Sequence, residues 1–176
     1  MPQTGCRTPT ATAKSSLLLK DRIPDKGDLL QWKWTSGAAT VKSEFGSPLA
    51  TTNYTVCIYD DVGGTPQLKL RAGIAAAGTC RGRPCWKETT HGFRYADKEA
   101  TPNGITKLSL KEGSAGRAAI GLQGRGEPLQ MPTLPLSQEL KVLVQLKNDT
   151  TGVCWEATFS ALAAKNDQAQ FRDKSD

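Results

Sequence analysis

The residues with the most distinctive chemistry in this chain are five cysteines: Cys6, Cys57, Cys80, Cys85 and Cys154. No pair has the C-x₂-C spacing of a zinc site and the chain holds a single histidine, His91, so disulfide bonds in an oxidising compartment fit better than metal binding. Cys80 and Cys85 flank a turn-forming stretch, Arg81 to Pro84, which a bond between them would close into a small loop.

The remaining cysteines suggest a second bond. Cys57 and Cys154 each lie in the middle of a strand-like segment, and we expect a disulfide to link those two segments. Cys6 is then left over, to pair with a residue upstream of this sequence. Other connectivities of the same cysteines remain open, so this pairing is a preference.

Catalytic residue types are sparse. A Ser–His or Cys–His site would have to use His91, which lies in Thr89-Thr90-His91-Gly92 with no nucleophile elbow near any serine. No carboxylate has the apolar surroundings that tune a general acid, and the glycines from Gly121 to Gly126 lack the order of a dinucleotide-binding loop. We therefore predict no enzyme and no cofactor; a hydrolase that uses carboxylates or His91 is the alternative.

Three nearby aspartates are the main metal-ligand candidates, and Asp60-Asp61 form a second pair. Asp21, Asp25 and Asp28 offer the oxygen ligands that Ca²⁺ prefers. Their spacing is not that of an EF-hand, and Arg22 and Lys26 oppose cation binding. A solvated loop is the favoured interpretation, and we predict no metal site.

Aromatic residues give the one candidate binding site. Trp32, Trp34 and Trp155 share faces with aliphatic residues, which predicts that they are buried. Trp86 directly follows Pro84-Cys85, so it is the tryptophan that we would choose for stacking on a sugar, although packing over the adjacent disulfide is the more common use of such a ring. The candidate binding residues are Trp86, Arg81, Arg83, His91 and Tyr95.

The elements that would position these residues are short strands. Apolar and polar side chains alternate along segments that end in Gly, Pro, Asn or Asp, the pattern of antiparallel strands with one face in water. These segments are 30–35, 54–59, 68–71, 107–111, 118–122, 140–147 and 153–159, with 17–20 added. We predict an all-β fold, an antiparallel β-sandwich of the jelly-roll or immunoglobulin-like kind, with a small β-barrel as the alternative.

The domain organisation follows from the same pattern. We predict one β-sandwich domain over 15–160, an N-terminal extension or linker over 1–14, and a loosely ordered tail over 161–176. No run of large aliphatic residues exceeds three, as in Leu17-Leu18-Leu19, which is too short to cross a membrane, and 1–14 lacks the apolar stretch of a signal peptide. We therefore expect any export signal to lie upstream of this sequence.

The net charge of +6 invites a nucleic-acid interpretation. The 23 Lys and Arg are scattered among 17 Asp and Glu, without a block of like charges, a zinc finger or an RNA-binding aromatic motif. We predict a solvated surface with no nucleic-acid partner, and weak attraction to anionic glycans or cell walls at most.

Several strings of the chain together resemble a known domain. They include Gly5-Cys6-Arg7, Leu30-Gln31-Trp32-Lys33-Trp34-Thr35, Pro84-Cys85-Trp86-Lys87, Gly152-Val153-Cys154-Trp155 and the closing residues from Lys165 to Asp176. They are similar to a functionally uncharacterised Cys- and Trp-containing domain found at the C-termini of large secreted proteins of environmental bacteria. The resemblance covers nearly the whole chain. It implies an extracellular setting with upstream domains of the parent chain as partners, and it brings no activity or site residue.

These observations predict a secreted, non-enzymatic accessory or adhesion module, with a glycan or cell-surface polymer as the candidate ligand. The alternative is a structural role without a ligand, as a cap at the C-terminus of a larger secreted protein.

Overall fold

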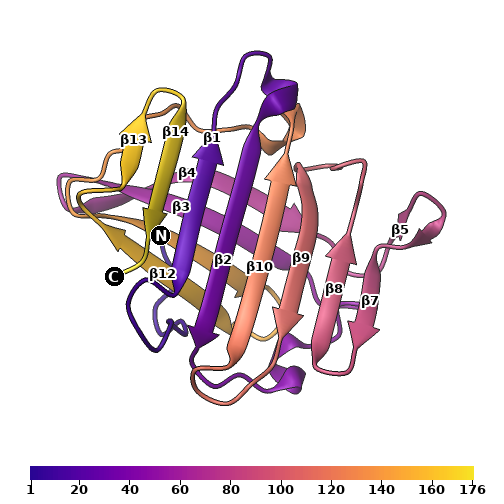
Figure 1. The fold of residues 1–176 in the computed structure, drawn as a ribbon. Helices are drawn as coiled ribbons and strands as arrows, with labels where there is room; N and C mark the ends of the chain where they lie inside the picture. Colours follow the sequence, from indigo (N-terminus) through magenta and orange to yellow (C-terminus); the bar gives the residue numbers. More distant parts are fainter.

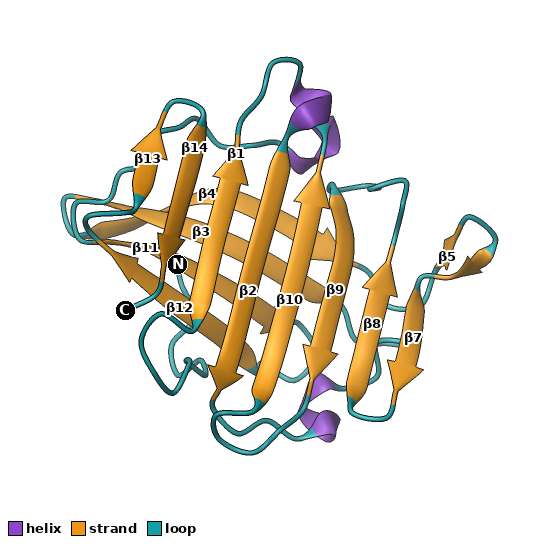
Figure 2. Ribbon diagram, in the orientation of Figure 1, coloured by secondary structure: helices purple, strands orange, loops and turns teal.

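The computed structural model describes residues 1–176 and shows an antiparallel β-sandwich that is not closed into a barrel, as the alternation predicted. In Figures 1 and 2 an eight-stranded sheet lies in front of a four-stranded sheet, and the strands of the two sheets cross at a wide angle. The eight-stranded sheet has the order β13 (Lys165–Asp167), β14 (Gln170–Lys174), β1 (Ser15–Lys20), β2 (Leu29–Gly37), β10 (Ala118–Arg125), β9 (Ile105–Lys111), β8 (Gly92–Ala96) and β7 (Trp86–Thr89).

The smaller elements complete the fold. The four-stranded sheet has the order β12 (Cys154–Ser160), β11 (Lys141–Asn148), β3 (Tyr54–Val62) and β4 (Thr65–Ile74). A two-stranded hairpin, β5 (Thr79–Cys80) and β6 (Arg83–Pro84), projects beyond β7. Three short 3₁₀ helices are η1 (Asp25–Gly27), η2 (Lys42–Phe45) and η3 (Glu127–Leu129). None of the helices has the length and apolar character needed to cross a membrane.

Aromatic side chains fill the space between the sheets. All four tryptophans are buried in one core cluster of 32 residues, each with its indole N–H hydrogen-bonded. A buried tryptophan needs such a partner, because an unpaired polar group in the core costs free energy. The acceptors are Ser15 Oγ for Trp32, the Glu156 carbonyl for Trp34, the Ala75 carbonyl for Trp86 and Thr40 Oγ1 for Trp155.

The N-terminal segment is not a linker, because it pairs with the free edge of β12 at Arg7 and contacts the outer face of the four-stranded sheet at Gln3. The N–H of Arg7 donates to the Cys154 carbonyl and the N–H of Glu156 donates to the Arg7 carbonyl, each at 2.8 Å. Gln3 and Gln145 exchange two further hydrogen bonds, of 2.9 and 2.7 Å. The same segment reaches β3, where the Tyr59 hydroxyl donates to the Met1 carbonyl at 3.3 Å, and it contributes to the burial of this strand on both faces.

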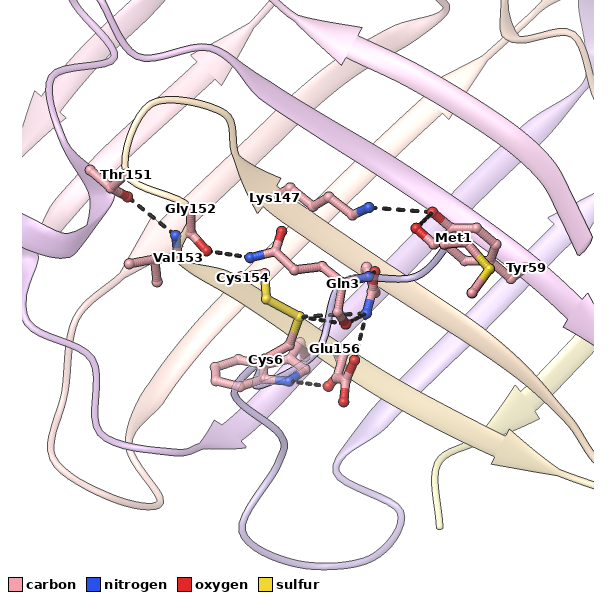
Figure 3. Close-up of a disulfide and its surroundings, with 12 residues drawn as sticks. Met1, Gln3, Cys6, Tyr59, Lys147, Thr151, Gly152, Val153, Cys154 and Glu156 are labelled. Carbon is pink, nitrogen blue, oxygen red and sulfur yellow. Dashed lines mark hydrogen bonds between the residues drawn. A yellow bond between two sulfur atoms is a disulfide. The ribbon is translucent and has the colours of Figure 1, made fainter. Parts of the chain in front are cut away.

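The disulfides correct one predicted pair. Cys80 and Cys85 are bonded, as expected, but Cys154 is bonded to Cys6 (Figure 3). Cys57 is a buried free cysteine. The expected bond between Cys57 and Cys154 is wrong because both residues lie in one sheet. Cys57 pairs with Gln145 of β11, and β11 separates it from β12, so two strand spacings of about 5 Å put the two thiols beyond disulfide reach.

The bond from Cys6 to Cys154 ties the N-terminal segment to β12. Its sequence separation is 148 residues, and a bond that closes so long a loop contributes about 2–4 kcal/mol to stability. The segment therefore belongs to the folded unit.

The predicted loose tail over 161–176 is also corrected. β14 pairs along β1, with Leu18 opposite Arg172, and β13 pairs with β14. Phe171 is fully buried. The alternation escaped sequence inspection because Phe171 is the only large apolar residue in the two strands.

We predict that this thiol arrangement appears directly in labelling. The native protein should react with no thiol reagent, because Cys57 is 4% exposed and the other cysteines are bonded. Unfolding without reductant should expose one thiol, and reduction should expose all five. Mass spectrometry of the labelled peptides measures this, and a peptide that joins Cys57 to Cys154 would contradict the structure.

Candidate functional site

Two of the predicted binding residues lie in the core. Trp86 is 2% exposed and Tyr95 is 8% exposed. The Trp86 ring packs between Tyr54 and Tyr95, with ring centroids 5.7 and 5.2 Å away. Burial raises the pKa of Tyr95, and the nearby charge of Asp97 raises it further. Trp86 is therefore a packing residue, and its ring face is not available to a sugar.

The other predicted binding residues lie at opposite ends of β7. Arg81 and Arg83 are exposed on the β5–β6 hairpin, where they line an open hollow of about 510 Å³ together with Lys98. Arg81 Nε lies 3.7 Å from Glu99 Oε1, so one of these charges has a partner. His91 lies in the turn between β7 and β8. The structure thus does not bring the predicted set together.

His91 lines a shallow hollow of about 910 Å³ that also contains Glu112 and Ser114. Its Nδ1 is 3.6 Å from Glu112 Oε1, too far for a hydrogen bond, and Glu112 Oε2 accepts a hydrogen bond from the Lys42 N–H at 2.9 Å. No hydrogen bond joins Ser114 to His91, whereas an activated serine is bonded to its base. These residues form an open polar cluster on the surface.

The three candidate calcium ligands do not converge. Asp28 is buried and its Oδ1 accepts a hydrogen bond from the Arg22 N–H at 2.8 Å, which fixes the turn. Burial raises the pKa of Asp28, and the charges of Asp21 and Asp25 add to that shift. No group of three acidic, His or Cys residues is placed to hold a metal ion anywhere in the structure.

The strongest feature of the surface is the outer face of the eight-stranded sheet, which we call the basic face. Cross-strand pairing and alternation turn ten cationic side chains outward on it. They are Lys20, Lys33, Lys87, Arg94, Lys107, Lys111, Arg125, Lys165, Arg172 and Lys174. Asp167 is the one acidic residue on the strands' outward positions, and it pairs with Lys165 at 3.2 Å.

These cations have few partners within the chain: Lys165 pairs with Asp167, and the Arg125 guanidinium donates to the Lys98 carbonyl at 3.0 Å. Apart from the Lys165 pair, no salt bridge involves any of the ten. Lys87 lies directly opposite Arg94, and Lys165 lies directly opposite Arg172. Like charges in facing positions destabilise a sheet, so a fold selected for stability alone would avoid them. The arrangement leaves a broad positive surface that an anion can neutralise.

Neighbouring acids in the sequence do not neutralise the basic face, because alternation sends them elsewhere. Glu88 follows Lys87 but faces the other way and pairs with Lys42 at 2.7 Å. Asp173 lies between Arg172 and Lys174 but shares the inward side of β14 with Phe171. The charge distribution is therefore uneven in space although it is even along the chain.

The basic face has a hollow of about 640 Å³ over β14, β1 and β2. Six of its lining residues form two cross-strand rows, Arg172–Leu18–Gln31 and Lys174–Ser16–Lys33. None of these six side chains makes a hydrogen bond or salt bridge within the chain. The hollow thus offers three free cations, an amide and a hydroxyl around a half-buried leucine.

Sequence inspection missed the basic face for a physical reason. Its cations come from strands that are far apart in sequence, such as β14 beside β1 and β10 beside β2. The available signal was the alternation of inward and outward positions: each cation lies at an outward, polar position of its strand. Without the strand order, this alternation does not show which strands are neighbours, and so it does not show which cations share a face of the sheet.

Comparison of the chain with protein-family models, curated proteins and solved structures finds no match.

We predict that Trp86 acts on stability alone. Trp86→Ala should lower the free energy of unfolding by about 3–5 kcal/mol, because it leaves a cavity beside Tyr54 and Tyr95. Arg83→Ala, an exposed control on the nearby hairpin, should change it by less than about 0.5 kcal/mol. Denaturant unfolding measures both values, and a near-neutral Trp86→Ala would contradict the packing described.

Proposed function

We propose that this chain is an extracellular, non-enzymatic binding module whose basic face contacts an anionic polymer such as an acidic glycan. The observation that supports this most is the set of cations on one open sheet face with almost no internal partners. Like-charge pairs are costly unless something outside the chain offsets them. A polymer with regularly repeated negative charges compensates the repulsion between these cations along the sheet face.

The cysteines support the extracellular part of the proposal. Two disulfides, one of which ties the N-terminal segment to β12, persist best in an oxidising compartment. A setting within a larger secreted protein, implied by the resemblance noted above, belongs to the same proposal.

A glycan suits the basic face better than a nucleic acid does. Single-stranded nucleic acids bind proteins by stacking bases on aromatic rings as well as by charge. All four tryptophans are buried, and no aromatic residue occupies an outward position of the eight-stranded sheet. Lysine, glutamine and serine side chains instead offer hydrogen bonds to sugar hydroxyls and acidic groups.

The alternatives have weaker support. Hydrolysis at the hollow around His91 would need a nucleophile bonded to the imidazole, and Ser114 makes no such bond. A purely structural cap is compatible with the rigid, disulfide-tied sandwich, but it gives no reason for opposed like charges. Binding of an anionic polymer accounts for both the rigid sandwich and the opposed like charges.

We predict selective binding of acidic polymers. The chain should bind immobilised alginate and dextran sulfate but not neutral dextran. The binding should weaken as salt is added, because the Debye length falls from about 10 Å at 0.1 M to about 3 Å at 1 M ionic strength. The double variant Lys107→Gln/Lys111→Gln should bind about fivefold more weakly, from two exposed charges worth about 0.5 kcal/mol each. Biolayer interferometry measures these affinities.

A matched control removes the same charge from the other sheet. Arg71 and Lys141 are exposed on the outer side of the four-stranded sheet. Arg71→Gln/Lys141→Gln should change binding by less than about twofold, because it leaves the basic face intact. Equal losses in the two double variants, or equal binding to neutral dextran, would refute the proposed role of the basic face.

A further inference from the structure

We propose that the hollow over β14, β1 and β2 is a subsite for one uronic acid residue of an acidic polysaccharide, with Arg172 as its carboxylate-binding residue. This inference rests on the proposed function and specifies the ligand. Its volume of about 640 Å³ falls within the range of small-ligand sites, about 300–1,000 Å³.

The two rows of residues match the parts of an acidic sugar. Leu18 is half-buried at the centre of its row and presents an apolar surface to the C–H groups of a pyranose ring. Arg172 lies directly opposite Leu18 on the next strand, one spacing of about 5 Å away. A uronic acid carries its carboxylate directly on the ring, so a ring over Leu18 brings the carboxylate to the guanidinium.

The polar groups of the hollow are free for a ligand. Ser16 and Gln31 offer a hydroxyl and an amide, and neither side chain has a partner within the chain. Lys33 and Lys174 lie on either side of Ser16 and supply two more charges. Sugar hydroxyls meet donors and acceptors here, while the carboxylate of the next sugar in the polymer can approach either lysine.

The one acid that lines the hollow is already engaged. Asp173 accepts hydrogen bonds from the backbone N–H groups of Ala164 and Lys174, at 3.3 and 2.9 Å, and from the Gln138 amide at 3.4 Å. The bond from Ala164 holds the segment before β13 against β14, and Ala164 also lines the hollow. The acid therefore builds the site and leaves Arg172 without an ion pair.

Arginine is the informative residue because its planar guanidinium can hold a carboxylate through two parallel hydrogen bonds, whereas lysine acts as a point charge. The charge-retaining change Arg172→Lys thus separates a shaped carboxylate site from general attraction. Arg172 is exposed, so the variant should fold normally, and the near-ultraviolet circular dichroism of the buried tryptophans checks this.

The test is isothermal titration calorimetry of the full chain with tetragalacturonate and with the same tetramer after reduction of its carboxylates to alcohols. We expect the reduced tetramer to bind at least about tenfold more weakly than the acidic one. Arg172→Lys should weaken tetragalacturonate binding about tenfold while changing dextran sulfate binding less than about twofold. Lys107→Arg, a charge-retaining control on the basic face outside the hollow, should change neither.

The outcomes distinguish this inference from the proposed function. If Arg172→Lys leaves the tetragalacturonate affinity unchanged while Lys107→Gln/Lys111→Gln weakens binding, the subsite at the hollow is overturned but the basic face remains the binding surface. Double-stranded DNA that binds as tightly as the uronate, with no effect of Arg172→Lys, would overturn the sugar subsite in favour of a nucleic-acid partner. No binding of any acidic polymer would overturn both proposals.

Discussion

The structure depends on one constraint: each sheet must bury one side against the other, and strand alternation then decides where every remaining side chain goes. Four tryptophans with satisfied indole N–H groups fill much of the space between the crossed sheets. Because side chains alternate with a period of two, the residues between those that face the core must point outward. The N-terminal segment crosses the outer side of the four-stranded sheet and is bonded to β12, whereas the outer side of the eight-stranded sheet is open.

That open face concentrates positive charge at a cost in stability. Opposed pairs such as Lys87 and Arg94 repel, and the buried core and the Cys6–Cys154 bond offset the cost. The hollow at Arg172 lies on the same face, between strands that are well apart in the sequence. Binding function in this account requires no moving part. It follows from the strand order and from a shortage of acids at outward positions.

How much of this could be predicted from the sequence depends on the range of the interaction. The alternation in β2, with Leu30, Trp32 and Trp34 on one side, is a local signal and predicted the fold and the core correctly. β14 escaped because its burial rests on Phe171 alone. The Cys154 bond was mispaired because sequence does not show that β11 lies between β3 and β12. Trp86 had two possible environments that only the packing of Tyr54 and Tyr95 distinguishes. Prediction of the basic face required the strand order, which is a non-local property.

The most direct test of the account is an NMR titration of the ¹⁵N-labelled chain with tetragalacturonate. Shifts of backbone amides should be largest in β14, β1 and β2, smaller in β10 and β9, and near zero in β3, β4 and β11. The indole N–H signals of the four tryptophans should stay in place, because those groups are bonded within the core. Shifts centred on the four-stranded sheet or on the turn at His91 would contradict the claim that the basic face is the binding surface.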